Sequence, residues 1–152
     1  MFGRYDFGGD RAVDWVDFER PAAGTARECG RDIASPQVEV LLSAYGEAWE
    51  KLRWLDLAHE GGVTLAQWRE GLADRPVRER IEDVFGSAAD AEFTLADLDQ
   101  DHELSVDELL DLLSGAALHP LDAVEMARRC SAADSGITRR VYREARLRLD
   151  AL

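Results

Sequence analysis

The sequence is poor in lysine and methionine, and it has no long apolar run. Lys51 is the only lysine among 18 basic residues, which face 31 acidic residues and give a formal net charge of −13 at neutral pH. A surface with this charge repels phosphate backbones, so we expect no nucleic-acid partner. No apolar run has the length of a membrane span, and the N-terminus lacks the pattern of a signal peptide. These absences predict a cytoplasmic protein that does not enter a membrane.

Cysteine and the common catalytic motifs are also scarce or missing. Cys29 and Cys130 are far apart and have no CxxC partner, so we expect free thiols and no zinc site. There is no GxSxG, HExxH, phosphate-binding glycine loop or dinucleotide fingerprint. The sequence therefore indicates no particular enzyme chemistry.

Residues 97–108 carry oxygen-bearing side chains at alternate positions. A calcium ion takes six to eight oxygen ligands, and a loop of twelve residues can wrap around it when carboxylates alternate in this way. The segment is typical of an EF-hand calcium loop. Its expected ligands are Asp97, Asp99, Asp101, the backbone carbonyl of Glu103, Ser105, and both carboxylate oxygens of Glu108. His102 stands at the sixth place, where glycine is usual, so we expect a weakened site.

The register of this loop recurs three more times along the chain. The four windows are 6–17, 56–67, 97–108 and 130–141. The eighth place is always aliphatic, and it is Val13, Val63, Leu104 or Ile137. The residue after each window is always apolar, namely Phe18, Trp68, Leu109 or Tyr142, and so is the residue four before it, namely Phe2, Leu52, Phe93 or Met126. This agreement predicts four related helix-loop-helix units.

The other three windows have lost ligands to different degrees. The first retains Asp6, Asp10, Asp14 and Asp17 but has Gly8 at the third place, so we expect at most a marginal site, for Ca²⁺ or for Mg²⁺. The second ends in Gln67, which cannot replace a bidentate carboxylate. The fourth retains only Asp134 among its acidic positions. We expect no cation in the second and fourth windows.

Helical segments are predicted between the windows, three of them before the third window. Ser35 and Pro36 begin a helix that ends at Leu52 and should be the longest in the chain. Residues 21–36 read as a loop with at most a short helical piece. A helix that begins near Asp74 should end at Gly86, and a separate short helix should cover 87–96.

Spacing and register together resemble a known family. The chain is similar to bacterial calerythrin and the sarcoplasmic calcium-binding proteins, whose members have four packed EF-hands with a long segment between the first two. The resemblance implies one compact, all-α domain over residues 1–152, with four EF-hand-like units in two packed pairs. One pair would comprise residues 1–75 and the other 76–152, with short β-bridges between paired loops. Only residues 97–108 match the family's full ligand pattern.

The sequence favours a calcium-binding protein with one competent site and an ion that is structural or weakly regulatory. We expect a dissociation constant of roughly 10⁻⁷ to 10⁻⁵ M or weaker. An alternative is an EF-hand scaffold that has become an enzyme or a binding protein for a small hydrophobic ligand, in a pocket lined by the aromatic residues Tyr45, Trp49, Trp54, Trp68, Phe85 and Phe93. A third hypothesis is a sensor with a dedicated protein partner, although two methionines are few for an adaptable groove.

Overall fold

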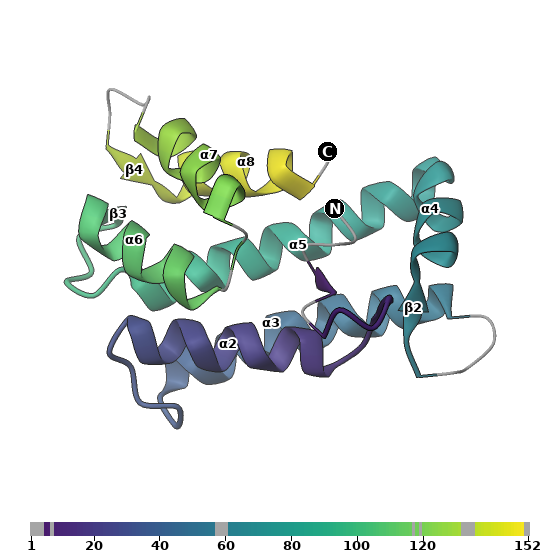
Figure 1. Ribbon diagram of the computed structural model, residues 1–152. Helices are drawn as coiled ribbons and strands as arrows, with labels where there is room; N and C mark the ends of the chain where they lie inside the picture. Colours follow the sequence, from purple (N-terminus) through teal and green to yellow (C-terminus); the bar gives the residue numbers. More distant parts are fainter. Residues whose placement is uncertain are drawn as a thin grey trace.

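We describe the protein from a computed structural model that places residues 5–6, 8–56, 61–116, 118, 120–131 and 136–150 (Figure 1). The first half contains β1 (Ala12–Val13), α2 (Val16–Glu28), α3 (Pro36–Leu52), the short 3-10 helix η1 (Arg53–Leu55), β2 (Val63–Thr64) and α4 (Leu65–Ala73). The second half contains α5 (Arg75–Ala96), β3 (Glu103–Leu104), α6 (Val106–Gly115), α7 (Pro120–Ser131), β4 (Ile137–Thr138) and α8 (Arg139–Asp150). The predicted all-α class is confirmed. No helix in these residues is both long enough and apolar enough to cross a bilayer.

The two pairs of strands are the predicted bridges between loops. Val13 faces Val63 in the first antiparallel pair, and Leu104 faces Ile137 in the second. All four side chains are buried. The first loop therefore pairs with the second, and the third with the fourth, as the shared aliphatic position predicts.

The apolar positions that flank the loops form much of the core. Phe18, Trp68, Leu109 and Tyr142, which follow the four loops, are each at most 2% exposed. Leu52, Phe93 and Met126, which precede three loops, are fully buried, and Phe2 lies outside the described residues. The apolar residues that recur at the same places around the loops are therefore core residues.

Helix α5 organises the arrangement. It runs across the molecule, with α2 and α3 on one side and α7 and α8 on the other (Figure 1). It packs against both α3 and α8, while α2 packs against α6. The proposed boundary between the two halves, at residue 75, falls at the first residue of α5.

The predicted break at Gly86 is wrong, because α5 is continuous from Arg75 to Ala96. A Cβ on Gly86 would collide with the guanidinium of Arg143 on α8. The glycine therefore makes room for this side chain rather than ending the helix. With 22 residues, α5 is longer than the 17-residue α3, which the sequence had favoured as the longest helix.

The predicted loop over residues 21–36 is also mostly helical, because α2 extends to Glu28 with Pro21 inside it. Gly24 and Gly115 lie at a close crossing of α2 and α6, where a Cβ on either glycine would meet the backbone of the other helix. A Schellman motif at Gly30 follows the last residue of the helix. Gly30 has a φ of 63°, and the N–H of the next residue, Arg31, donates to the Ala26 carbonyl at 2.8 Å. Gly30, rather than Pro21 or Gly24, is the stop signal.

Candidate metal centre

The third loop has the backbone that a cation loop requires. Gln100 and His102 have φ angles of 62° and 71°, so the sixth place is left-handed although it is not glycine. The His102 N–H donates to a carboxylate oxygen of Asp97 at 3.3 Å, which closes the turn. Histidine at this place therefore preserves the turn, at a backbone cost of about 1 kcal/mol.

Asp97, Asp99 and Glu108 converge within this loop. A carboxylate oxygen from each lies within 4.8 Å of the others. Asp97 is 5% exposed, and its Oδ1 atom has no hydrogen-bond partner among the described residues. A buried carboxylate oxygen without a partner is costly, and a bound cation would remove that cost.

Glu108 is held in place by the start of α6. Its Oε1 accepts from the Leu98 N–H at 2.8 Å, and its Oε2 accepts from the Ser105 N–H at 2.9 Å and the Ser105 hydroxyl at 2.8 Å. Desolvation alone would raise the Glu108 pKa, but the hydrogen bonds from Leu98 and Ser105 outweigh it and lower the pKa. The carboxylate is therefore oriented and ionised where the twelfth ligand is needed.

The remaining predicted ligands lie in the loop but outside the three-carboxylate cluster. Asp101 Oδ1 accepts from the Glu103 N–H at 2.8 Å. Glu103 pairs with Thr138 through the β-bridge, and its side chain lies against Gly136. Ser105 accepts from the Glu108 N–H at 3.2 Å, which completes the capping box that the sequence predicts.

Arg31 is a neighbour of this site that sequence reasoning missed. Its Nε donates to the Leu95 carbonyl and its Nη2 to the Asp97 carbonyl, both at 3.0 Å. Arg31 thus fixes the backbone where α5 gives way to the loop. Nothing in the local pattern around residue 31 indicates this contact, because its partners are more than sixty positions away.

The first loop has the same shape but uses its carboxylates differently. Asp6 accepts from the Asp10 and Arg11 N–H groups, both at 3.1 Å. The buried Asp17 accepts from the Gly8 N–H at 3.0 Å and the Asp14 N–H at 2.9 Å. No three acidic side chains converge here among the described residues. The four aspartates of this loop act as acceptors for its own backbone.

The second and fourth loops keep parts of the backbone conformation of the third loop but lack most of its acidic ligands. The Gly61 N–H donates to Asp56 at 3.0 Å, and Gln67 accepts from the Thr64 N–H at 2.7 Å, so an amide occupies the twelfth place. Cys130 occupies the first place of the fourth loop, and burial raises the pKa of its thiol to about 11. That thiol is therefore neutral at physiological pH. Asp134 lies outside the described residues.

Comparisons with known proteins agree with this fold. Calerythrin from Saccharopolyspora erythraea is 25% identical over 128 residues, which cover 82% of this chain and 72% of calerythrin. The solved structure of a Streptomyces coelicolor calcium-binding protein, studied for prokaryotic calcium-mediated regulation, superposes with a TM-score of 0.82 at 20% identity and covers 97% of this chain and 91% of that one. No family model matches. The chain is similar to calerythrin in sequence and shares the fold of the Streptomyces calcium-binding protein. The resemblance inferred from the four windows is confirmed.

The interior of this calerythrin-like protein contains a buried polar cluster that sequence reasoning missed. Glu92 on α5 is 1% exposed and accepts from the Tyr45 hydroxyl at 2.6 Å and the Tyr142 hydroxyl at 2.7 Å. Arg146 on α8 lies 3.4 Å from the same carboxylate. Burial and the charge on Glu92 raise the pKa values of both tyrosines well above their usual range. Tyr45, Glu92 and Tyr142 thus join α3, α5 and α8.

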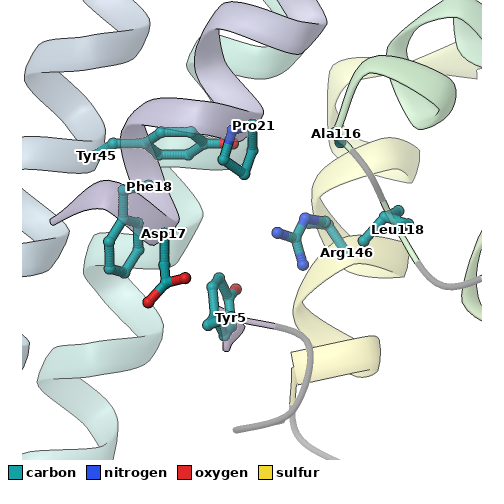
Figure 2. Close-up of a pocket in the computed structure, with 8 residues that line it drawn as sticks. All are labelled: Tyr5, Asp17, Phe18, Pro21, Tyr45, Ala116, Leu118 and Arg146. Atoms are coloured by element: carbon teal, nitrogen blue, oxygen red, sulfur yellow. The ribbon is translucent and has the colours of Figure 1, made fainter. Parts of the chain in front are cut away.

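A small cavity borders this cluster. Figure 2 shows Arg146 reaching from α8 toward Tyr5 and Asp17, with Phe18, Pro21 and Tyr45 nearby. The cavity has a volume of about 10 Å³, which is room for about one water molecule. Trp54, one of the aromatic residues assigned to the core from sequence, is instead 75% exposed. The remaining rings fill the space that a hydrophobic ligand would need here.

Proposed function

We propose that this calerythrin-like protein binds one calcium ion, in the loop 97–108. The observation that carries the proposal is the buried, unpartnered Oδ1 of Asp97, with oxygens of Asp99 and Glu108 within 4.8 Å. Carboxylate oxygens are the ligands that calcium prefers. The Streptomyces coelicolor protein, which is described as calcium-binding, supports the choice of ion.

The ligand set would comprise six residues of the loop. Asp97, Asp99 and Asp101 would supply side-chain oxygens, Glu103 its carbonyl, Ser105 its hydroxyl or a bridging water, and Glu108 its carboxylate. Glu108 Oε1 accepts one hydrogen bond and keeps a lone pair for the ion, whereas Oε2 accepts two and would bind the ion only if the Ser105 hydroxyl turned away. The capping of α6 and the binding of the ion are therefore compatible.

We propose a structural or weakly regulatory role for this ion. It would join the end of α5 to the start of α6, and the pairing of Leu104 with Ile137 would link it to the fourth loop. The first loop would remain a structural turn, because no three of its acidic side chains converge among the described residues and Asp17 is shorter than glutamate. A Mg²⁺ or Ca²⁺ ion at that loop remains the weaker hypothesis. The free, buried thiols of Cys29 and Cys130 support a cytoplasmic location.

The alternative of a hydrophobic ligand or substrate finds no support in the aromatic core. The cavity beside Tyr5 and Tyr45, at about 10 Å³, is far smaller than the several hundred Å³ of a typical small-molecule site. We therefore do not propose an aromatic ligand pocket at this position.

Isothermal titration calorimetry with calcium tests the proposal. The wild type should show one binding event in the range of roughly 10⁻⁷ to 10⁻⁵ M or weaker. Glu108→Gln should weaken it by about a hundredfold or more, because a ligand in direct contact with the ion loses its charge. Glu103→Gln is the matched control: it removes the same charge from the same loop but leaves the carbonyl ligand. Equal isotherms for wild type and Glu108→Gln, or equal losses in both variants, would contradict the assignment.

A further inference from the structure

A second polar pocket lies beside the third loop. It has a volume of about 220 Å³ and is formed where the end of α5, the start of α3 and the start of α8 meet the loop. Arg31, Arg139 and His102 line it together with Gln37, Gln100 and the carboxylate-bearing Asp97. The pocket lining therefore has more basic than acidic side chains. This balance is the opposite of that of the whole protein, whose net charge is −13.

The guanidinium of Arg139 is fixed in position but not saturated. It stacks over the ring of Phe93 with 4.9 Å between its Cζ and the ring centroid. Its Nη1 donates to the Asp90 carbonyl at 2.8 Å and to the Thr94 hydroxyl at 2.9 Å. Its Nε and Nη2 make no hydrogen bond to any described residue. A preorganised guanidinium with free N–H groups loses little entropy when it binds an anion.

Arg31, which also lines the pocket, is likewise held by hydrogen bonds. Its Nε and Nη2 bind the carbonyls of Leu95 and Asp97, and its Nη1 has no bond to a described residue. Both arginines also offset the negative end of α5, because all their backbone acceptors belong to its last two turns or to the residue that follows it. Two arginines, each with a free donor, thus line one pocket.

We propose that this pocket binds a small free oxyanion, of the sulfate, phosphate or carboxylate class. The planar guanidinium is the side chain best matched to such groups, and the amides of Gln37 and Gln100 add donors. The volume of about 220 Å³ admits an inorganic anion or a short dicarboxylate. Asp97 is the single group in the pocket that opposes an anion.

Calcium should therefore strengthen this site, an inference that rests on the calcium function proposed above. A cation bound by Asp97 neutralises the one opposing charge in the pocket. Because coupling between two ligands is reciprocal, the anion should raise the calcium affinity by the same factor. The oxyanion site itself does not require calcium.

Titration of sulfate and, separately, succinate into calcium-free protein tests the site. Arginine Nε–Hε resonances in NMR spectra report which side chain responds. We expect saturable shifts at Arg139 with at least one of the two anions; a response to sulfate alone indicates tetrahedral anions, and one to succinate alone indicates carboxylates. Shifts with neither anion, or shifts that are no larger at Arg139 than at Arg140, would overturn the proposal.

Arg139→Gln should weaken anion binding by roughly tenfold or more, because charged hydrogen bonds are lost. Arg140→Gln is the matched control, since Arg140 is the adjacent residue, pairs with Glu144 and does not line the pocket. Arg139→Lys retains the charge without the planar fork, so we expect an intermediate affinity. Equal affinities for the Arg139→Gln and Arg140→Gln variants would refute the site, and the NMR experiment on the wild type decides the matter if the variants fold poorly.

The calcium effect is measured by repeating the sulfate titration at saturating calcium. We expect the sulfate affinity to rise about fivefold or more in the wild type. Glu108→Gln should abolish this rise while leaving the calcium-free sulfate affinity intact. A wild type that binds no calcium would refute the proposed function but not the oxyanion site. Calcium binding without any change in sulfate affinity would refute the coupling alone.

Discussion

The first and third loops share a backbone but differ in what their acids do. Both have positive φ at the fourth and sixth places, through Gly9 and Arg11 in one and Gln100 and His102 in the other. In both, the sixth-place N–H donates to the first-place aspartate, and the ninth-place N–H donates to the twelfth-place carboxylate. Among the residues that the structure describes, only the third loop gathers three carboxylates and leaves one of their buried oxygens unpartnered.

The difference shows that loop shape and ion binding are separable. The second loop retains the same two bonds with Asp56, Gly61, Thr64 and Gln67, although it lacks the acidic twelfth residue. These bonds join backbone to side chain within each loop and need no metal. The shape therefore persists wherever the two acceptors remain, whereas binding requires additional carboxylates that converge on one point.

The largest expected effect comes from neutralising the first-place aspartate in each loop. Asp97→Asn should weaken calcium binding by about a hundredfold, because it removes the buried charge that faces the ion. Asp6→Asn makes the same change in the first loop and should leave the calcium isotherm unchanged. Calorimetry of both variants measures the contrast. A large loss in Asp6→Asn would show that the first loop binds the ion and would remove the distinction drawn here.

A substitution that adds metal binding to the first loop tests the same distinction between the two loops. Gly8→Asp restores the third-place ligand, and there is room for it, because the atoms nearest to a Cβ at this position are 3.8 Å away. We expect a second, weak binding event for Ca²⁺ or Mg²⁺, since Asp17 is shorter than glutamate.

Gly9→Asp serves as the control for that experiment. It adds the same charge one position later, at the fourth place, where no ligand is needed and where φ is 68°. It should add no binding event. A calorimetric trace for Gly8→Asp that matches the wild type would show that more than the third ligand is missing from the first loop.

The register of the fold could be predicted from sequence because it depends on positions fixed relative to each loop. Val13, Val63, Leu104 and Ile137 pair as expected, and Ser105 with Glu108 forms the expected cap. These relations are local or follow from a repeat, so a single sequence displays them. The predicted ligand residues all lie in the third loop, but only three of them converge as a cluster.

The errors arose where glycine serves a partner that is distant in sequence. Gly86 was predicted to end a helix and Gly24 to lie in a loop, yet each lies inside a helix and makes room for a neighbour, Arg143 in one case and the backbone at Gly115 in the other. Arg31 and the buried Glu92 likewise act through contacts with residues about fifty or more positions away. Periodicity cannot reveal such contacts, because nothing in the local pattern marks them.

The smallest expected effect concerns the left-handed residues at the sixth place. Arg11→Gly and His102→Gly should each stabilise the calcium-free protein by up to about 1 kcal/mol, because a side chain raises the energy of this conformation. The gain should be larger for Arg11, since histidine tolerates the region better. Thermal unfolding should register roughly 2–4 °C per kcal/mol for a chain of this size.

Gly61→Ala provides the reverse control for these two substitutions. Gly61 has a φ of 91°, and no atom of a described residue lies within 4 Å of a Cβ at this position, so we expect the cost of alanine to be mainly a backbone cost. We expect the melting temperature to fall by a similar amount. If His102→Gly instead lowers the melting temperature while Arg11→Gly raises it, the His102 side chain stabilises the third loop by more than its backbone strain costs. The nearest contact that could supply this is its Nδ1 atom, 4.0 Å from Asp97. The residue at the sixth place would then distinguish the two loops, in addition to the residues at the third and twelfth places.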